Sequence, residues 1–252
     1  MGKRAARRAQ AAYVQESNVR ALNNQPPKGG WHPLGAEDGA DQRDKSYVRK
    51  VKPYNEAQGQ LMEAIDTHNL IMALGPAGTG KTYLAIAKAV EALEKGEVAR
   101  IMLTRPAVEA GENLGYLPGE LEDKLAPYLR PLYDALTDRM GGQKLKARLA
   151  DGTIEIAPVA YMRGRTLNNA FVVIDEAQNC TYGQLKMLLT RLGWHSTMVF
   201  TGDPDQSDLL PGMSGFGDMA QRLDALDDVS VVRLKDKDIV RHPLVAAMLT
   251  VI

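Results

Sequence analysis

A phosphate-binding pattern lies at the start of the apolar part of the chain. The segment Gly75-Pro-Ala-Gly-Thr-Gly-Lys-Thr82 follows the apolar run Leu70–Leu74 and precedes a helical pattern. Its glycines let backbone N–H groups face phosphate oxygens, its lysine neutralises phosphate charge, and its threonine hydroxyl binds Mg²⁺. A chance glycine-rich turn is the structural alternative. The pattern predicts an ATP site made by Gly75, Pro76, Ala77, Gly78, Thr79, Gly80, Lys81, Thr82 and Tyr83.

Two neighbouring carboxylates follow a second apolar run, Phe171–Ile174. In P-loop enzymes a carboxylate at such a strand end binds Mg²⁺, and its neighbour can orient an attacking water. We expect Asp175, with Thr82, to be the metal ligands, and Glu176 to join Lys81 as a catalytic residue. The structural alternative is that these acids only cap the helix that follows.

A third apolar run, Met198–Thr201, leads into the polar segment Gly202-Asp-Pro-Asp-Gln206. Ligands of open α/β folds bind at the carboxyl ends of the strands, where this segment would lie. We therefore expect Gln206 to sense the γ-phosphate. A plain turn rich in Gly, Asp and Pro remains the alternative interpretation.

The elements that must position these residues follow an α/β pattern, in which short apolar runs alternate with helical stretches. It predicts a single RecA-like P-loop NTPase core, a parallel sheet sandwiched by helices, over residues 54–252. Pro127 and Pro131 predict a break or kink in one helix. The expected strands are Leu70–Leu74, Ile101–Thr104, Ile154–Pro158, Phe171–Ile174, Met198–Thr201 and Val229–Leu234, and the expected helices are Asn55–Thr67, Lys81–Glu94, Glu120–Met140, Tyr182–Leu192, Gly215–Leu226 and His242–Thr250.

Residues 1–53 form a different kind of segment, a basic and largely flexible arm with one short helix expected near residues 5–22. They carry eleven Lys or Arg and five acids, so the arm has a net charge of +6 while the whole chain has none. A basic arm can follow a nucleic-acid backbone by releasing counterions. A solvated, disordered tail is the alternative interpretation.

Composition indicates the cellular compartment in which we expect the protein. A membrane span needs about 18 consecutive apolar residues, and no such run is present. The basic start is not followed by the apolar stretch of a secretory signal. The single cysteine, Cys180, excludes an internal disulfide. We expect a cytoplasmic protein that has no membrane partner.

With these motifs in view, residues 54–252 resemble the PhoH family, ATPases associated with phosphate starvation whose core is similar to the first motor domain of superfamily-one helicases. The order of the motifs makes this resemblance specific. Besides the P-loop, the matching segments are Thr104-Arg-Pro-Ala-Val-Glu-Ala-Gly-Glu-Asn-Leu-Gly115, Leu117-Pro-Gly-Glu-Leu121, Pro127-Tyr-Leu-Arg-Pro-Leu-Tyr133, Tyr161-Met-Arg-Gly-Arg-Thr-Leu167, Asp175-Glu-Ala-Gln-Asn179, Thr201-Gly-Asp-Pro-Asp-Gln206 and Asp238-Ile-Val-Arg-His-Pro-Leu244.

The resemblance implies further roles. Gln58 resembles the glutamine that contacts the adenine edge, and Arg241 the arginine finger that acts on the γ-phosphate. Because one core supplies half of such a site, it also implies a homo-oligomer, a hexameric ring by family analogy, with Arg241 acting on the next subunit. The alternative for Arg241 is an ion pair with Asp238 or another nearby carboxylate. Arg105 and Glu109 would contact single-stranded nucleic acid or pair with each other, and Arg163 and Arg165 would contact phosphate or nucleic acid.

Two classes of function follow from these residues. The first is a Mg²⁺-dependent ATPase that couples hydrolysis to binding or helicase-like remodelling of single-stranded RNA or DNA. The second is an ATP-gated oligomeric regulatory or scaffold protein without motor activity. Glu176 beside Asp175 favours the first, because a protein that only binds nucleotide needs no carboxylate to polarise water.

Overall fold

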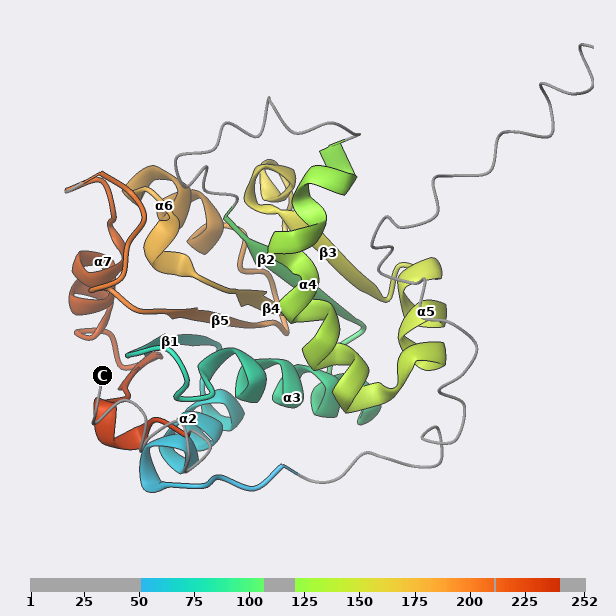
Figure 1. The fold of residues 1–252 in the computed structure, drawn as a ribbon, viewed down its shortest axis with the longest axis horizontal. Helices are drawn as coiled ribbons and strands as arrows, with labels where there is room; N and C mark the ends of the chain where they lie inside the picture. The colour runs from blue at the N-terminus through green and yellow to red at the C-terminus, as the bar shows by residue number, and fades with distance from the viewer. Residues whose placement is uncertain (1–50, 107–120, 211, 241–252) are drawn as a thin grey trace, which may run out of the picture. The chain divides into compact units, whose positions relative to one another are not determined.

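A six-stranded parallel sheet organises the part of the chain that this computed structural model describes, residues 51–106, 121–210 and 212–240 (Figure 1). Its strands lie in the order β3-β2-β4-β5-β1-β6. The predicted α/β fold with a parallel sheet is confirmed, and each predicted strand end lies within one residue of the observed one. The strands are β1 (Leu70–Leu74), β2 (Arg100–Arg105), β3 (Ile154–Pro158), β4 (Ala170–Ile174), β5 (Thr197–Gly202) and β6 (Val229–Arg233).

Continuous apolar runs form these strands because both faces of the sheet are covered. Every residue of β1 and of β4 is buried. Along β1, Ile71 and Ala73 join one hydrophobic cluster, whereas Met72 and Leu74 join a second cluster on the opposite face. The period of two that places successive side chains on opposite faces thus divides the core into two layers.

Helices cover the two faces in separate groups (Figure 1). Side chains of α2, α3, α4 and α5 belong to the first cluster, and side chains of α6 and α7 belong to the second. Short 3-10 turns follow β3 (η2, Val159–Met162), β4 (η3, Ala177–Asn179) and β6 (η4, Asp236–Asp238). The helices are α2 (Glu56–Thr67), α3 (Lys81–Glu94), α4 (Leu121–Met140), α5 (Gly142–Ala150), α6 (Tyr182–Leu189) and α7 (Phe216–Leu223).

The predicted break in helix α4 is wrong, because the helix runs unbroken past both Pro127 and Pro131. Proline removes a hydrogen bond from a helix, but tertiary packing contributes most of a helix's stability. Leu129, Leu132 and Leu136 are buried in the first cluster and supply that packing. Helix α5 is absent from the sequence prediction, and the helices expected near residues 5–22 and 242–250 lie outside the described residues.

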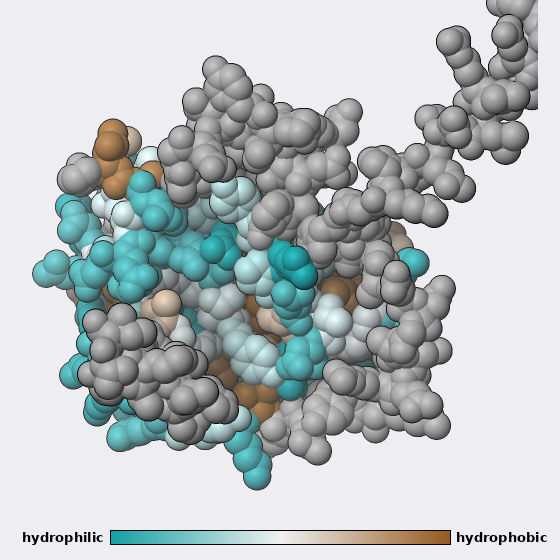
Figure 2. Space-filling model, viewed as in Figure 1, coloured by the Kyte–Doolittle hydropathy of each residue, from teal (hydrophilic) through white to brown (hydrophobic). Residues whose placement is uncertain are grey.

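The described surface carries hydrophobic side chains in scattered places. The face in Figure 2 is mainly hydrophilic or mixed where it is coloured, with small separate hydrophobic areas. Trp194 and Leu210 are among the large apolar side chains exposed to solvent. No described helix combines the length and the apolar character needed to cross a membrane.

Leu103 and Leu210 give a matched test of the core. Leu103 on β2 has no exposed surface, whereas Leu210 is 76% exposed. We expect Leu103→Ala to lower the free energy of unfolding by about 2–5 kcal/mol, since it removes buried methyl groups and leaves a cavity. Leu210→Ala should change the same free energy, measured by urea denaturation, by less than about 0.5 kcal/mol. Equal losses in the two variants would contradict this placement of the core.

Candidate functional site

The predicted phosphate-binding loop connects β1 to α3 at the carboxyl edge of the sheet. Gly75, Gly78 and Gly80 have φ values of +141°, +84° and +87°, a region that glycine adopts without strain. A Cβ atom at Gly75 would also collide with the carbonyl oxygen of Leu234. Backbone conformation and close packing therefore both require glycine at the start of the loop.

Lys81 is buried against its own loop. Its Nζ donates hydrogen bonds to the carbonyl oxygens of Gly75 at 2.6 Å and Pro76 at 2.8 Å. Burial lowers the pKa of the Lys81 ammonium, while the carboxylates of Asp203, Glu176 and Asp175 act to raise it. The cation is thus placed inside the predicted phosphate-binding loop and close to three acidic side chains.

Asp175 follows β4, and its side chain is buried where three elements meet. Its Oδ1 accepts hydrogen bonds from the hydroxyls of Thr82 at 2.6 Å and Thr201 at 2.8 Å. Mg²⁺ prefers oxygen ligands and keeps waters and substrate phosphates around a few protein donors. The paired oxygens of Thr82 and Asp175 fit that preference, so these two predicted metal ligands are brought together.

Glu176 adopts a left-handed backbone conformation, with φ of +53°. Few non-glycine residues adopt this region, and strained residues often occur at functional sites. Its Oε1 lies 3.4 Å from Nη2 of Arg105, whose Nη1 lies 3.7 Å from Oδ2 of Asp175. Arg105 is therefore placed beside the two neighbouring carboxylates, while its predicted partner Glu109 lies outside the described residues.

The segment after β5 adds polar groups to the same edge. Gln206 is exposed there, and its backbone N–H donates to the carbonyl oxygen of Asp203. Two side chains to which the sequence prediction gives no role also lie here: Asp203, which is buried beside Lys81, and Gln178, which contacts Glu176. Their polar character next to the two acidic motifs is the signal that could have identified them.

Gln58 is buried against the phosphate-binding loop. Its Nε2 donates to the carbonyl oxygen of Thr79 at 2.9 Å, and its Oε1 accepts from the N–H of Tyr54 at 2.9 Å. The amide thus connects the start of α2 to the loop. Contact with adenine would use the donor and acceptor positions of the Gln58 amide that these two bonds leave free. The role of Gln58 at adenine stays a prediction.

Other predicted residues differ in their surroundings. Tyr83 donates its hydroxyl to Asp138 at 2.7 Å and so links α3 to α4. Arg165 makes a bidentate pair with Glu155, with N–O distances of 2.6 and 2.8 Å, which favours a structural role over nucleic-acid contact. Arg163 is exposed, and Arg241 lies outside the described residues.

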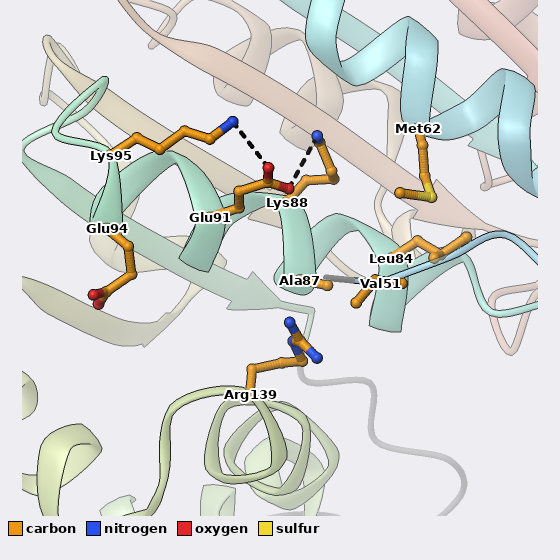
Figure 3. Close-up of a pocket in the computed structure, with 9 residues that line it drawn as sticks. All are labelled: Val51, Met62, Leu84, Ala87, Lys88, Glu91, Glu94, Lys95 and Arg139. Atoms are coloured by element: carbon orange, nitrogen blue, oxygen red, sulfur yellow. Dashed lines mark hydrogen bonds and ion pairs between the residues drawn. The ribbon is translucent and has the colours of Figure 1, made fainter. Parts of the chain in front are cut away.

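A cavity of about 390 Å³ lies beside α3 but away from the phosphate-binding loop (Figure 3). No residue of Gly75–Thr82 lines it. Lys88 and Lys95 point toward Glu91 along one side of the cavity, and Arg139 extends toward the cavity from α4. The predicted site and this cavity are therefore separate features of the described surface. The lining residues are Val51, Met62, Leu84, Ala87, Lys88, Glu91, Glu94, Lys95 and Arg139.

Cys180 follows the acidic motif but is directed into the second hydrophobic cluster. Burial raises the pKa of its thiol to about 12. At pH 8 we expect a thiolate fraction of about 10⁻⁴, so the native protein should react with a thiol reagent far more slowly than the urea-unfolded chain. The colour released by an aromatic disulfide reagent measures both rates. Comparable rates would contradict the burial of Cys180.

Comparisons with known proteins point to one family. The family model described as PhoH-like protein matches residues 50–252. A PhoH-like protein of Bacillus subtilis (strain 168) is 51% identical over 202 residues, 80% of this chain and 63% of that protein. Protein PhoH of Escherichia coli (strain K12) is 46% identical over 205 residues, 80% of this chain and 58% of that protein. The chain thus spans roughly three fifths of the length of these relatives.

Among solved structures, the large terminase from a thermophilic bacteriophage is similar with a TM-score of 0.50. The two proteins are 14% identical, and the match covers 79% of this chain and 50% of the terminase chain. At this level of identity the similarity concerns the fold alone. It agrees with the RecA-like P-loop core predicted from the sequence.

Proposed function

This chain belongs to the PhoH-like family, and on that premise we propose that it binds and hydrolyses ATP in a Mg²⁺-dependent reaction. The observation that carries this proposal is the 2.6 Å hydrogen bond between Thr82 and Asp175. It joins the phosphate-binding loop to the acidic strand end, so a metal-binding hydroxyl and a carboxylate lie together beside Lys81. A simple glycine-rich turn or a helix-capping acid would need no such connection.

Each residue of the site has its own role in the proposed hydrolysis. Backbone N–H groups of Gly75–Thr82 and the amino end of α3 would bind the phosphates, and Lys81 would neutralise their charge. Glu176 would orient the attacking water, and Gln206 would respond to the γ-phosphate. Thr82 and Asp175 would hold Mg²⁺, which would neutralise phosphate charge.

A second copy of the chain would complete the site. A helicase motor encloses its nucleotide between two cores, whereas residues 54–252 are predicted to form one core. In the proposed ring, hexameric by family analogy, Arg241 of one subunit would stabilise charge on the γ-phosphate held by the next. The location of the site at an edge of the sheet, with Gln206 exposed, supports this arrangement.

Hydrolysis would be coupled to single-stranded RNA or DNA. The net charge of +6 on residues 1–53 supports this part of the proposal, because clustered Lys and Arg attract a phosphate backbone. The helicase-like order of the motifs supports it as well. An oligomeric scaffold that is gated by ATP is the alternative, and it predicts nucleotide binding with little turnover.

Replacing Glu176 tests the chemical step. Glu176→Gln removes the carboxylate that orients water, so we expect kcat to fall by about 10²–10⁴-fold while ATP still binds. Glu63→Gln is the matched control because Glu63 is exposed on α2. Phosphate release and the Kd for ATP should be measured for both variants. Normal turnover in Glu176→Gln would show that Glu176 does not orient the water, and absence of turnover in the unmodified protein would favour the scaffold.

Replacing three arginines of the arm tests the nucleic-acid partner. Arg4, Arg7 and Arg8 changed to Gln in the full chain should weaken binding of single-stranded RNA at low salt. Each lost phosphate contact should reduce the slope of log K against log salt by about 0.7. ATPase activity without RNA should stay unchanged. If RNA and single-stranded DNA neither bind nor stimulate the unmodified protein at low salt, this part of the proposal is wrong.

A further inference from the structure

Gln178 lies between the two acidic segments of the site and is 3% exposed. It belongs to η3, the turn that follows Asp175 and Glu176. Its side-chain amide makes hydrogen bonds to Glu176 and to the segment after β5. These bonds indicate a role in addition to packing.

One side of the amide contacts Glu176. Gln178 Nε2 donates to Oε2 of Glu176 at 2.5 Å, while Arg105 approaches the other carboxylate oxygen at 3.4 Å. A carboxylate can rotate about its side-chain bonds, so two partners on its two oxygens restrict its orientation. Gln178 supplies the nearer of these two contacts.

The other side of the amide contacts the segment after β5. Gln178 Oε1 accepts from the N–H of Asp203 at 3.1 Å, and Nε2 donates to the carbonyl oxygen of Gln206 at 3.5 Å. An amide nitrogen has two hydrogens, which allows it to serve Glu176 and Gln206 together. A movement of Gln206 is thereby connected to the carboxylate of Glu176 through one side chain.

The packing around Gln178 leaves space for this amide only because position 202 is glycine. A Cβ at Gly202 would collide with Gln178 Oε1. A separate connection exists one residue further on, where Asn179 Nδ2 donates to Asp208 and the N–H of Asp208 donates to Asn179 Oδ1, both at 2.8 Å. Two amides therefore connect the same segments, and the described hydrogen bond and ion pair of the Glu176 carboxylate come from Gln178 and Arg105.

We propose that Gln178 is a positioning residue that sets the orientation of the Glu176 carboxylate and couples it to the segment carrying Gln206. This inference rests on the proposed ATP hydrolysis. When Gln206 responds to a bound γ-phosphate, Gln178 transmits that response to Glu176. Water is then oriented for attack only when the triphosphate is in place.

Two substitutions of similar length test this role. Gln178→Met removes all three side-chain hydrogen bonds of Gln178, and Gln178→Glu keeps an acceptor for the N–H of Asp203 but can no longer donate to Glu176. We expect both to lower kcat by about 10- to 100-fold, because a small misplacement of a catalytic group has effects of this size. KM for ATP and Kd for Mg-ADP should stay within about twofold, because the phosphate-binding loop is unchanged.

Asn179→Ala is the matched control, since it removes side-chain hydrogen bonds between the same segments and leaves both the Glu176 carboxylate and the bond from the Asn179 N–H to the Glu176 carbonyl oxygen in place. It should lower the Tm about as much as Gln178→Met but leave kcat close to that of the unmodified protein. In a Glu176→Gln background, Gln178→Met should cause no further loss of residual turnover, because its effect passes through the carboxylate.

Three outcomes would overturn the positioning role: unchanged kcat in both Gln178 variants, an equal loss of kcat in Asn179→Ala, or a full additional loss in the Glu176→Gln background. Each would leave the proposed function standing. By contrast, an unmodified protein that does not hydrolyse ATP would contradict the proposed function itself.

Discussion

The hydrogen bond between Thr82 and Asp175 is the contact on which the site depends. It brings together residues that are 93 positions apart in the sequence, one at the start of α3 and one after β4. Thr201 donates to the same carboxylate oxygen from β5, which lies between β1 and β4 in the sheet. The order of the strands therefore produces the site, because the ends of β1, β4 and β5 meet at one edge.

At this edge of the sheet, cationic and acidic side chains lie next to one another. Lys81 lies in the phosphate-binding loop and donates to its carbonyl oxygens, while Asp203, Glu176 and Asp175 favour its ammonium form. Arg105 provides a second cation close to Asp175 and Glu176. Buried charges are tolerated when they are paired and hydrogen-bonded, and Lys81 and Asp175 meet that condition.

The elements and the central residues could be predicted from the sequence because their signals are local. Leu70–Leu74 is apolar throughout since β1 is covered on both faces, and the glycines of residues 75–80 match the positive φ values found there. Helix α5 escapes such a prediction because its first residue, Gly142, and the residue before it, Gly141, are both glycines, and its formation depends on the burial of Leu145 against the core. The unbroken α4 likewise depends on packing of Leu132 and Leu136.

Residues whose roles depend on distant partners could not be identified in this way. Gln178 meets Asp203 across 25 positions, and Gln58 meets Thr79 across 21, so neither contact is visible in a local pattern. The role of Gln58 at adenine comes from a resemblance, and the structure adds its contact with the loop. The pairing of Arg165 with Glu155 depends on strand β3 being in place, so the sequence left a nucleic-acid contact open for that arginine.

The most direct test of the central claim compares ATP binding with and without Mg²⁺ in the unmodified protein and in Asp175→Asn. Isothermal titration calorimetry with a non-hydrolysable ATP analogue gives both affinities. If Thr82 and Asp175 hold the metal, Mg²⁺ should strengthen binding to the unmodified protein and lose most of that effect in the variant. The same dependence on Mg²⁺ in both proteins would contradict the account.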